Sequence, residues 1–132
     1  MKTHLIKAML ALIFVLLTQT DLFAQAEDFK NSTPEERANF QTEWMKEELS
    51  LDSTIIKSVH AINLKYSKKN TELMKSGGSK ISKLKGFKSS SKEKDKELKN
   101  IFSKEQYDIY QKKKEEMQEL LRERIQEKRN KK

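Results

Sequence analysis

Helix-breaking residues are scarce in this chain, and their positions divide it into segments. The 132 residues include one proline, Pro34, and three glycines, Gly77, Gly78 and Gly86. No β-branched run alternates with polar residues, so the sequence carries almost no strand signal. Long stretches without breakers favour helices. The sequence therefore predicts an all-α fold of four helices, forming a thin hairpin-like protein.

The first helix is predicted to begin beside the proline. Thr33 suits the N-cap position, Pro34 suits the first helical position, and Glu36 completes a capping box with Thr33. The helix is expected to extend to Leu49. Its apolar face, which we expect to pack in the core rather than to bind a client, carries Phe40, Trp44 and Met45.

The second helix is predicted to follow Asp52, its expected N-cap. It should extend to about Lys75 and end at the turn around Gly77 and Gly78. Its apolar residues recur at helical spacing, which predicts a buried stripe of Ile55, Val59, Ile62, Tyr66 and Leu73.

The third helix, expected over residues 80–101, has the weakest pattern. Gly86 and three consecutive serines lower its helix propensity, and we expect it to fray near its middle. Acidic residues alternate with lysines between Glu93 and Glu97, which is typical of a solvated face. A broken apolar stripe is predicted along this helix: Ile81, Leu84, Phe87 or Lys88, Ser91, Leu98 and Ile101.

The fourth helix is predicted from the stretch FSKEQ at residues 102–106. Ser103 and Gln106 have the spacing of a capping box, in which the serine oxygen accepts the Gln106 N–H and the glutamine reaches back to the N-cap N–H. Phe102 precedes the cap and is placed to act as a hydrophobic staple. Apolar residues continue at spacings of three and four: Tyr107, Tyr110, Met117, Leu121 and Ile125.

The N-terminal residues have the layout of a secretory signal peptide. Lys2 and Lys7 form a positive region ahead of the short apolar run at residues 8–17, and the small residues Ala24 and Ala26 follow it. The run is shorter than the roughly 20 residues of a membrane span, so an uncleaved anchor is the less favoured alternative. Such a signal peptide would direct the protein to the periplasm and would be cleaved after Ala24 or Ala26. The predicted division is a signal peptide at 1–24, a flexible segment at 25–32, a four-helix domain at 33–129 and a basic tail at 130–132.

Arrangements typical of catalysis, such as a nucleophile beside a base or a pair of carboxylates, do not stand out in the predicted exported chain. It has no cysteine and one histidine, His60, with no second histidine one helical turn away. A metal site needs three or four ligands, and no glycine-rich phosphate loop occurs. We therefore expect no enzyme activity, no cofactor and no metal. The small number of large apolar residues predicts a thin core that a second copy of the chain would help to cover.

The chain is basic, with a formal charge of +8, and lysines are concentrated in its third segment. The simplest interpretation of these lysines is solubility. The alternative is a basic, partly apolar surface that attracts acidic or unfolded chains. Nucleic acid would suit the charge but not an exported protein, and peripheral contact with an anionic envelope surface is a lesser possibility. The predicted client-binding residues are Lys80, Ile81, Lys83, Leu84, Lys85, Phe87 and Lys88.

The FSKEQ stretch resembles the LTxxQ motif of the Spy/CpxP-like periplasmic chaperone family. A second, degenerate copy occurs earlier, where Leu51 and Asp52 take the Leu and Thr positions and Ile55 replaces the glutamine. The stretches TPEERANFQTEWMKEELSL and DKELKNIFSKEQYDIYQKKKEEM also look like the exported TPEERA-type branch of that family. The resemblance covers about residues 33–125.

The resemblance implies a four-helix protein that forms a thin antiparallel dimer and holds unfolded clients without ATP. Related members instead sense envelope stress by docking on a sensor kinase, and some bind metal. Our leading expectation is an ATP-independent holdase-like chaperone that acts on unfolded client proteins as a homodimer. The alternatives are an accessory regulator that binds a sensor kinase ectodomain and a protein that binds the envelope surface. The motif residues that match are Leu51, Asp52, Phe102, Ser103 and Gln106.

Overall fold

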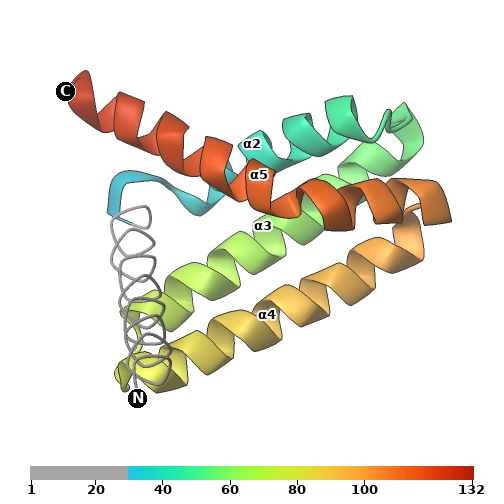
Figure 1. Ribbon diagram of the computed structural model, residues 1–132. Coiled ribbons are helices and arrows are strands. Elements are labelled where there is room, and N and C mark those ends of the chain that lie inside the picture. The colour runs from blue at the N-terminus through green and yellow to red at the C-terminus, as the bar shows by residue number, and fades with distance from the viewer. Residues whose placement is uncertain (1–29) are drawn as a thin grey trace, which may run out of the picture.

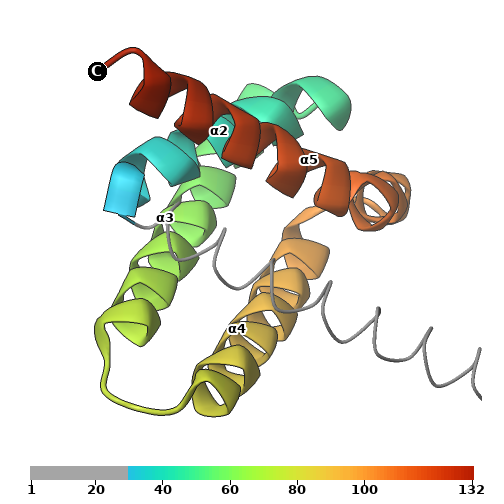
Figure 2. The ribbon, with the colours of Figure 1, turned by 60° about the vertical axis from the view of Figure 1, so that its left-hand side comes forward.

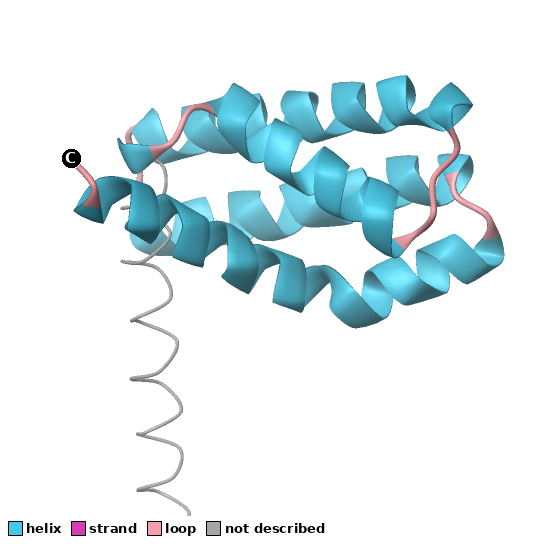
Figure 3. Ribbon diagram, turned by 90° about the horizontal axis from the view of Figure 1, so that it is seen from above, coloured by secondary structure: helices cyan, strands magenta, loops and turns pink. Residues whose placement is uncertain are grey.

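The computed structural model describes residues 30–132; the predicted signal peptide lies outside the described residues. Four α-helices account for most of this range (Figure 1), and none of the described residues lies in a strand (Figure 3). The predicted all-α fold is confirmed. The helices are α2 (Pro34–Glu48), α3 (Ser53–Lys75), α4 (Lys80–Ile101) and α5 (Lys104–Asn130).

The helices form a chain of hairpins in which α3 makes the most extensive contacts. It packs extensively against both α2 and α4, while α5 lies against α2 more than against α4. The α2–α3 and α4–α5 loops lie at one end of the molecule, and the α3–α4 turn lies at the opposite end (Figures 1 and 2). We call these the motif end and the turn end.

The apolar core is concentrated toward the motif end, because apolar residues of all four helices meet there. Ala38, Met45, Val59, Leu98 and Met117 are fully buried. The predicted packing of Trp44 in the core is confirmed, and Phe40 packs against the core from its edge. The main buried cluster consists of Trp44, Met45, Leu49, Leu51, Val59, Ile62, Tyr66, Leu98, Phe102, Tyr110 and Met117.

The helix starts follow from their capping residues. Thr33 Oγ1 accepts the Glu36 N–H at 3.1 Å while a Glu36 carboxylate oxygen accepts the Thr33 N–H at 2.9 Å, which is the predicted capping box. Asp52 caps α3, and Ser79 caps α4 by accepting the Ser82 N–H at 3.1 Å. Local hydrogen bonds therefore set the start of each of these helices.

The expected fraying of the third helix is wrong: α4 is one unbroken helix over Lys80–Ile101. Tertiary packing overrides its weak propensity. Gly86 lies against α3 so closely that a methyl group there would sit 2.9 Å from Cδ2 of Leu73. The glycine that lowers helix propensity thus permits the close approach of α3 and α4.

None of the described helices combines the length and the apolar character that a membrane span requires.

Candidate functional site

The loops that contain the two motif copies are joined by one side chain. Ser103 Oγ accepts the Gln106 N–H at 3.1 Å, and Gln106 Oε1 accepts the Ser103 N–H at 3.0 Å. The amide nitrogen of the same side chain donates to the Leu49 carbonyl at 3.4 Å. Gln106 therefore completes the cap of α5 and also ties that cap to the end of α2. Sequence reasoning found the cap but not this link, which requires an amide because a carboxylate has no N–H to donate.

The degenerate first copy has a simpler cap. Asp52 Oδ1 accepts the Thr54 N–H at 2.6 Å, and the hydroxyl and backbone N–H of Thr54 hold the pKa of this carboxyl below its ordinary value. Ile55, at the glutamine position, instead packs against the core. Leu51 and Phe102, the apolar residues of the two copies, are both buried. The motif residues therefore serve structure at the motif end.

The first half of α4 presents the apolar residues that are most exposed among those described. Ile81 is 68% exposed and Leu84 is 44% exposed. From Ser76 to Lys92 the sequence has five lysines and no acidic residue. We call the exposed residues of this region the α4 basic surface; they are Lys80, Ile81, Leu84, Lys85, Lys88 and Lys92.

Two of the predicted client-binding residues turn away from this surface. Lys83 Nζ donates to the Met74 carbonyl at 2.9 Å, which fixes the end of the α3–α4 turn. Phe87 is half-buried and faces a groove on the inner side of α4. Five of the seven predicted residues therefore lie together on the α4 basic surface. The other two, Lys83 and Phe87, instead contact the end of α3 and the inner groove.

The predicted apolar stripe of α4 has the wrong register in its first half. Ile81, Leu84 and Ser91 are exposed, whereas Leu98 is buried as expected. Moving back from Leu98 in steps of four residues leads along the inner face, which becomes polar. Its buried residues are Leu98, Lys94 and Ser90.

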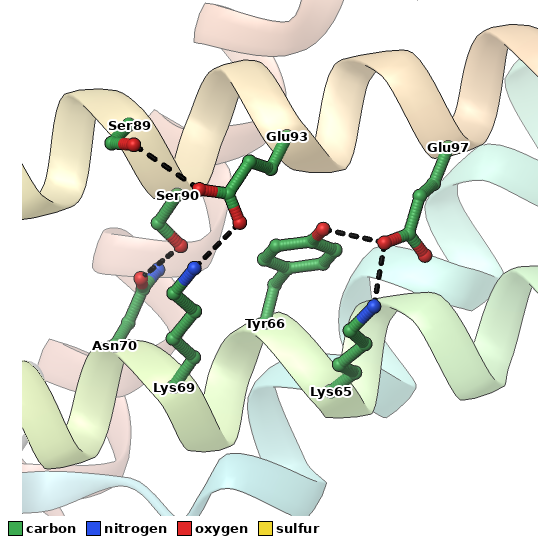
Figure 4. Close-up of polar contacts among 8 residues, drawn as sticks. All are labelled: Lys65, Tyr66, Lys69, Asn70, Ser89, Ser90, Glu93 and Glu97. Atoms are coloured by element: carbon green, nitrogen blue, oxygen red, sulfur yellow. Dashed lines mark hydrogen bonds and ion pairs between the residues drawn. The ribbon is translucent and has the colours of Figure 1, made fainter.

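Acidic residues of α4 hold it to α3 (Figure 4). Glu97 accepts hydrogen bonds from the Lys65 ammonium and the Tyr66 hydroxyl, both at 2.6 Å. Glu93 accepts one from the Lys69 ammonium at 2.6 Å. These lysines and the tyrosine hold the pKa values of Glu93 and Glu97 below the ordinary carboxyl range. The face predicted to be solvated is thus also ion-paired: Glu93 is exposed and Glu97 is half-buried.

A buried lysine lies on the inner face of α4, beneath a groove of about 310 Å³ between α3, α4 and α5. Lys94 is 9% exposed, and its ammonium donates to Gln41 Oε1 at 2.6 Å. Burial lowers the pKa of Lys94 to about 8, and the charge of Asp95 acts in the opposite direction. We call this the Lys94 groove; its lining includes Gln41, Asn70, Phe87, Lys94, Lys114 and Arg122.

The family comparison gives one match. The model described as a domain of unknown function, DUF4890, matches residues 20–110, which is more than half of the 132-residue chain. The chain belongs to the DUF4890 family. The matched region covers α2, α3 and α4 and ends within α5 at Tyr110. Comparison with curated proteins and with solved structures gives no match.

In this DUF4890 protein, residues 30–132 contain no cluster of three or more histidine, cysteine or acidic side chains that could hold a metal. His60, the predicted non-ligand, is half-buried, and its Nδ1 lies 3.4 Å from Thr42 Oγ1.

Sequence reasoning missed Lys94 because a lysine in a charged run usually faces water. The helical period nevertheless indicates that Lys94 is buried. Lys94 lies four residues before the fully buried Leu98, and residues four apart share one face of a helix. Following the period from a strong anchor, rather than from the weak residues Ile81 and Leu84, would have placed Lys94 on the inner face of this DUF4890 protein.

Proposed function

We propose that this protein is an exported, ATP-independent holdase-like chaperone that binds unfolded or acidic chains on the α4 basic surface. The signal-peptide layout of residues 1–24 supports export, and the order of the LTxxQ-like motifs supports the family resemblance. Neither catalysis nor a cofactor is part of the proposal. A second copy of the chain would extend the same surface.

The observation that carries the proposal is the mixed character of the α4 basic surface. Ile81 and Leu84 supply apolar contact area that none of the helices α2–α5 covers fully. Lys85 and Lys88 are exposed on the same half of α4, and neither forms an ion pair within residues 30–132. Exposed apolar area bordered by charge is a common feature of protein-binding surfaces.

Each part of this surface has a physical role in holding a client. The lysines attract acidic segments over a distance set by the Debye length, about 10 Å at 0.1 M salt. Apolar side chains then hold segments that an unfolded chain exposes. Binding of this kind requires no fixed sequence in the client.

The test is light scattering of a denatured, aggregation-prone acidic client diluted into buffer with the purified protein, without ATP and at two salt concentrations. We expect suppression of aggregation that weakens as salt rises. The pair Ile81→Ser and Leu84→Ser should reduce suppression at both salt concentrations. The pair Lys85→Gln and Lys88→Gln should reduce it mainly at low salt.

Matched controls separate the α4 basic surface from general effects. Leu120→Ser removes an exposed leucine from α5, and Lys57→Gln with Lys112→Gln removes the same charge from α3 and α5. These variants should suppress aggregation as the wild type does. Absence of suppression by the wild type would overturn the proposal. Saturable binding to one folded sensor ectodomain, without preference for unfolded chains, would then favour the regulatory alternative.

A further inference from the structure

The Lys94 groove combines features that a purely structural interior would avoid. Its central side chain is a lysine that is nine-tenths buried, and its wall contains the half-buried ring of Phe87. Burial of a charged group is unfavourable unless that group is paired. An aliphatic residue at position 94 would continue the apolar stripe that begins at Leu98. The buried ammonium of Lys94 therefore requires a partner that stabilises its charge.

The described contacts of the Lys94 ammonium leave room for such a partner. An ammonium has three donor hydrogens, and within residues 30–132 it donates one hydrogen bond, to Gln41 Oε1. Gln41 is uncharged, so this bond does not balance the charge of Lys94. The other donor hydrogens of the Lys94 ammonium have no acceptor within residues 30–132, and Lys94 lines the groove.

The neighbouring carboxylate is engaged elsewhere. Asp95 Oδ1 accepts the Tyr110 hydroxyl at 2.9 Å, and Asp95 Oδ2 accepts the Lys114 ammonium at 2.8 Å. These bonds join α4 to α5. Asp95 thus affects Lys94 through its charge, whereas its carboxylate accepts hydrogen bonds from Tyr110 and Lys114 on α5.

The lining of the groove is predominantly positive. Lys94, Lys114 and Arg122 contribute three cations and Glu115 one acidic group, while Asp95 pairs with Lys114 from outside the lining. Phe87 and Leu121 supply apolar wall. The groove is at the lower limit of the size of small-molecule sites, roughly 300–1,000 Å³. A small carboxylate with a short carbon frame matches this combination.

We propose that the Lys94 groove binds a carboxylate, with the Lys94 ammonium as its direct hydrogen-bond donor and the charges of Lys114 and Arg122 around it. The carboxylate belongs either to a free small organic acid or to an aspartate or glutamate side chain of a bound polypeptide. A carboxylate suits the site because its two oxygens accept charge-assisted hydrogen bonds. This proposal does not depend on holdase activity.

The test is NMR titration of the ¹⁵N-labelled purified protein with succinate and, separately, with a short unstructured peptide that contains one glutamate. Saturable shifts at the amides of Gln41, Ser90 and Lys94 are expected with at least one of the two probes. Saturation by succinate identifies a site for free acids, and saturation by the peptide alone identifies a site for acidic side chains. The neutral analogue succinamide, or the peptide with glutamine in place of glutamate, should cause no saturable shift.

Two lysine variants decide whether Lys94 is the contact. Lys94→Met keeps an unbranched side chain that packs in the interior and should weaken binding about tenfold or more, as loss of a charged hydrogen bond predicts. Lys96→Met makes the same chemical change at an exposed position of α4 that belongs neither to the groove lining nor to the α4 basic surface, and should bind like the wild type. Absence of saturable shifts with both probes, or wild-type affinity in folded Lys94→Met, would overturn the proposal. Folding of each variant is checked by the dispersion of its amide spectrum.

Discussion

The two ends of this molecule are built differently, although the same helices extend through both. At the motif end, Met45, Val59 and Leu98 are fully buried, and Gln106 ties one helix cap to another helix. Toward the turn end, the inner face of α4 becomes polar, first at Lys94 and then at Ser90, and its outer face carries exposed apolar residues. Along α4, the buried apolar side chain thus lies near the motif end and the exposed ones lie near the turn end.

This difference separates stability from binding. Burial of apolar area is the main favourable term in folding, so the motif end should contribute most of the free energy of unfolding. Between the middle of α4 and α3, polar contacts such as Lys69–Glu93 and Ser90–Asn70 take a larger share (Figure 4). The Lys69–Glu93 ion pair is exposed, so it contributes little and weakens with salt. The turn end therefore has surface available for binding.

The sharpest test of the contrast uses two leucines on one helix. Leu98→Ala removes a fully buried side chain and should lower the free energy of unfolding by about 2–5 kcal/mol. Leu84→Ala removes the same atoms from a 44% exposed position and should change it by less than about 0.5 kcal/mol. Urea denaturation followed by circular dichroism measures both. Equal losses would mean that the two ends share one core.

The second test titrates Lys94. Its folded-state pKa of about 8 lies below its ordinary value of 10.5, so between these pH values the unfolded chain binds a proton that the folded chain does not. Stability should therefore rise with pH across this window, and the wild type should gain on the order of 2 kcal/mol relative to Lys94→Met between pH 7 and 10. Denaturation midpoints at each pH measure the difference.

Other groups near Lys94 should not obscure this result. Burial raises the pKa values of Tyr66 and Tyr110, which lowers stability above about pH 10 in both proteins. Asp95, Lys114, Glu115 and Arg122 are also present in both. Parallel pH curves for the wild type and Lys94→Met would show that the lysine is effectively solvated in the folded state.

The third test concerns the cap at the motif end. Ser103→Ala removes the oxygen that accepts the Gln106 N–H and should lower the free energy of unfolding by about 1 kcal/mol. Ser91→Ala is the control, because Ser91 is exposed inside α4, where alanine is the better helix former. Thermal denaturation should show a lower Tm for Ser103→Ala only. An unchanged Tm would contradict the role assigned to the cap.

The smallest expected effect is at the ion pairs of Glu93 and Glu97. The pKa values of Glu93 and Glu97 are held below 4.5, so their pairs stabilise the fold above that value and are lost as the pH falls through the folded-state pKa. Glu93→Gln with Glu97→Gln should slightly lower the Tm at neutral pH and low salt, and should flatten its acid dependence. At 1 M salt the difference from the wild type should shrink. A salt-independent loss would assign these residues a packing role.

Much of the fold could be predicted from local patterns. Thr33, Asp52 and Ser103 are read correctly as caps because N-capping depends on residues within a few positions of each other. The stripe of Val59, Ile62 and Tyr66 is read correctly because its apolar period is strong. The prediction failed in α4, where propensity suggested fraying and the apolar pattern was too sparse to fix the inner face.

The candidate site was predictable in composition but not in arrangement. A lysine-rich segment with Ile81 and Leu84 could be recognised without coordinates, whereas the inward positions of Lys83 and Phe87 could not. Their direction depends on the rotation of α4 against α3. That rotation is fixed by the contact of Gly86 with Leu73 and by the ion pairs of Glu93 and Glu97, which join residues distant in the sequence.

The sequence by itself determined the helices, their caps and the positive charge of the third segment, because these depend on neighbouring residues and on composition. Only the tertiary structure decided that Gln106 links two loops, that Lys94 is buried and that Ile81 is exposed. These outcomes depend on which helix faces meet. Packing of the complete set of helices selects those faces, and no single segment contains that information.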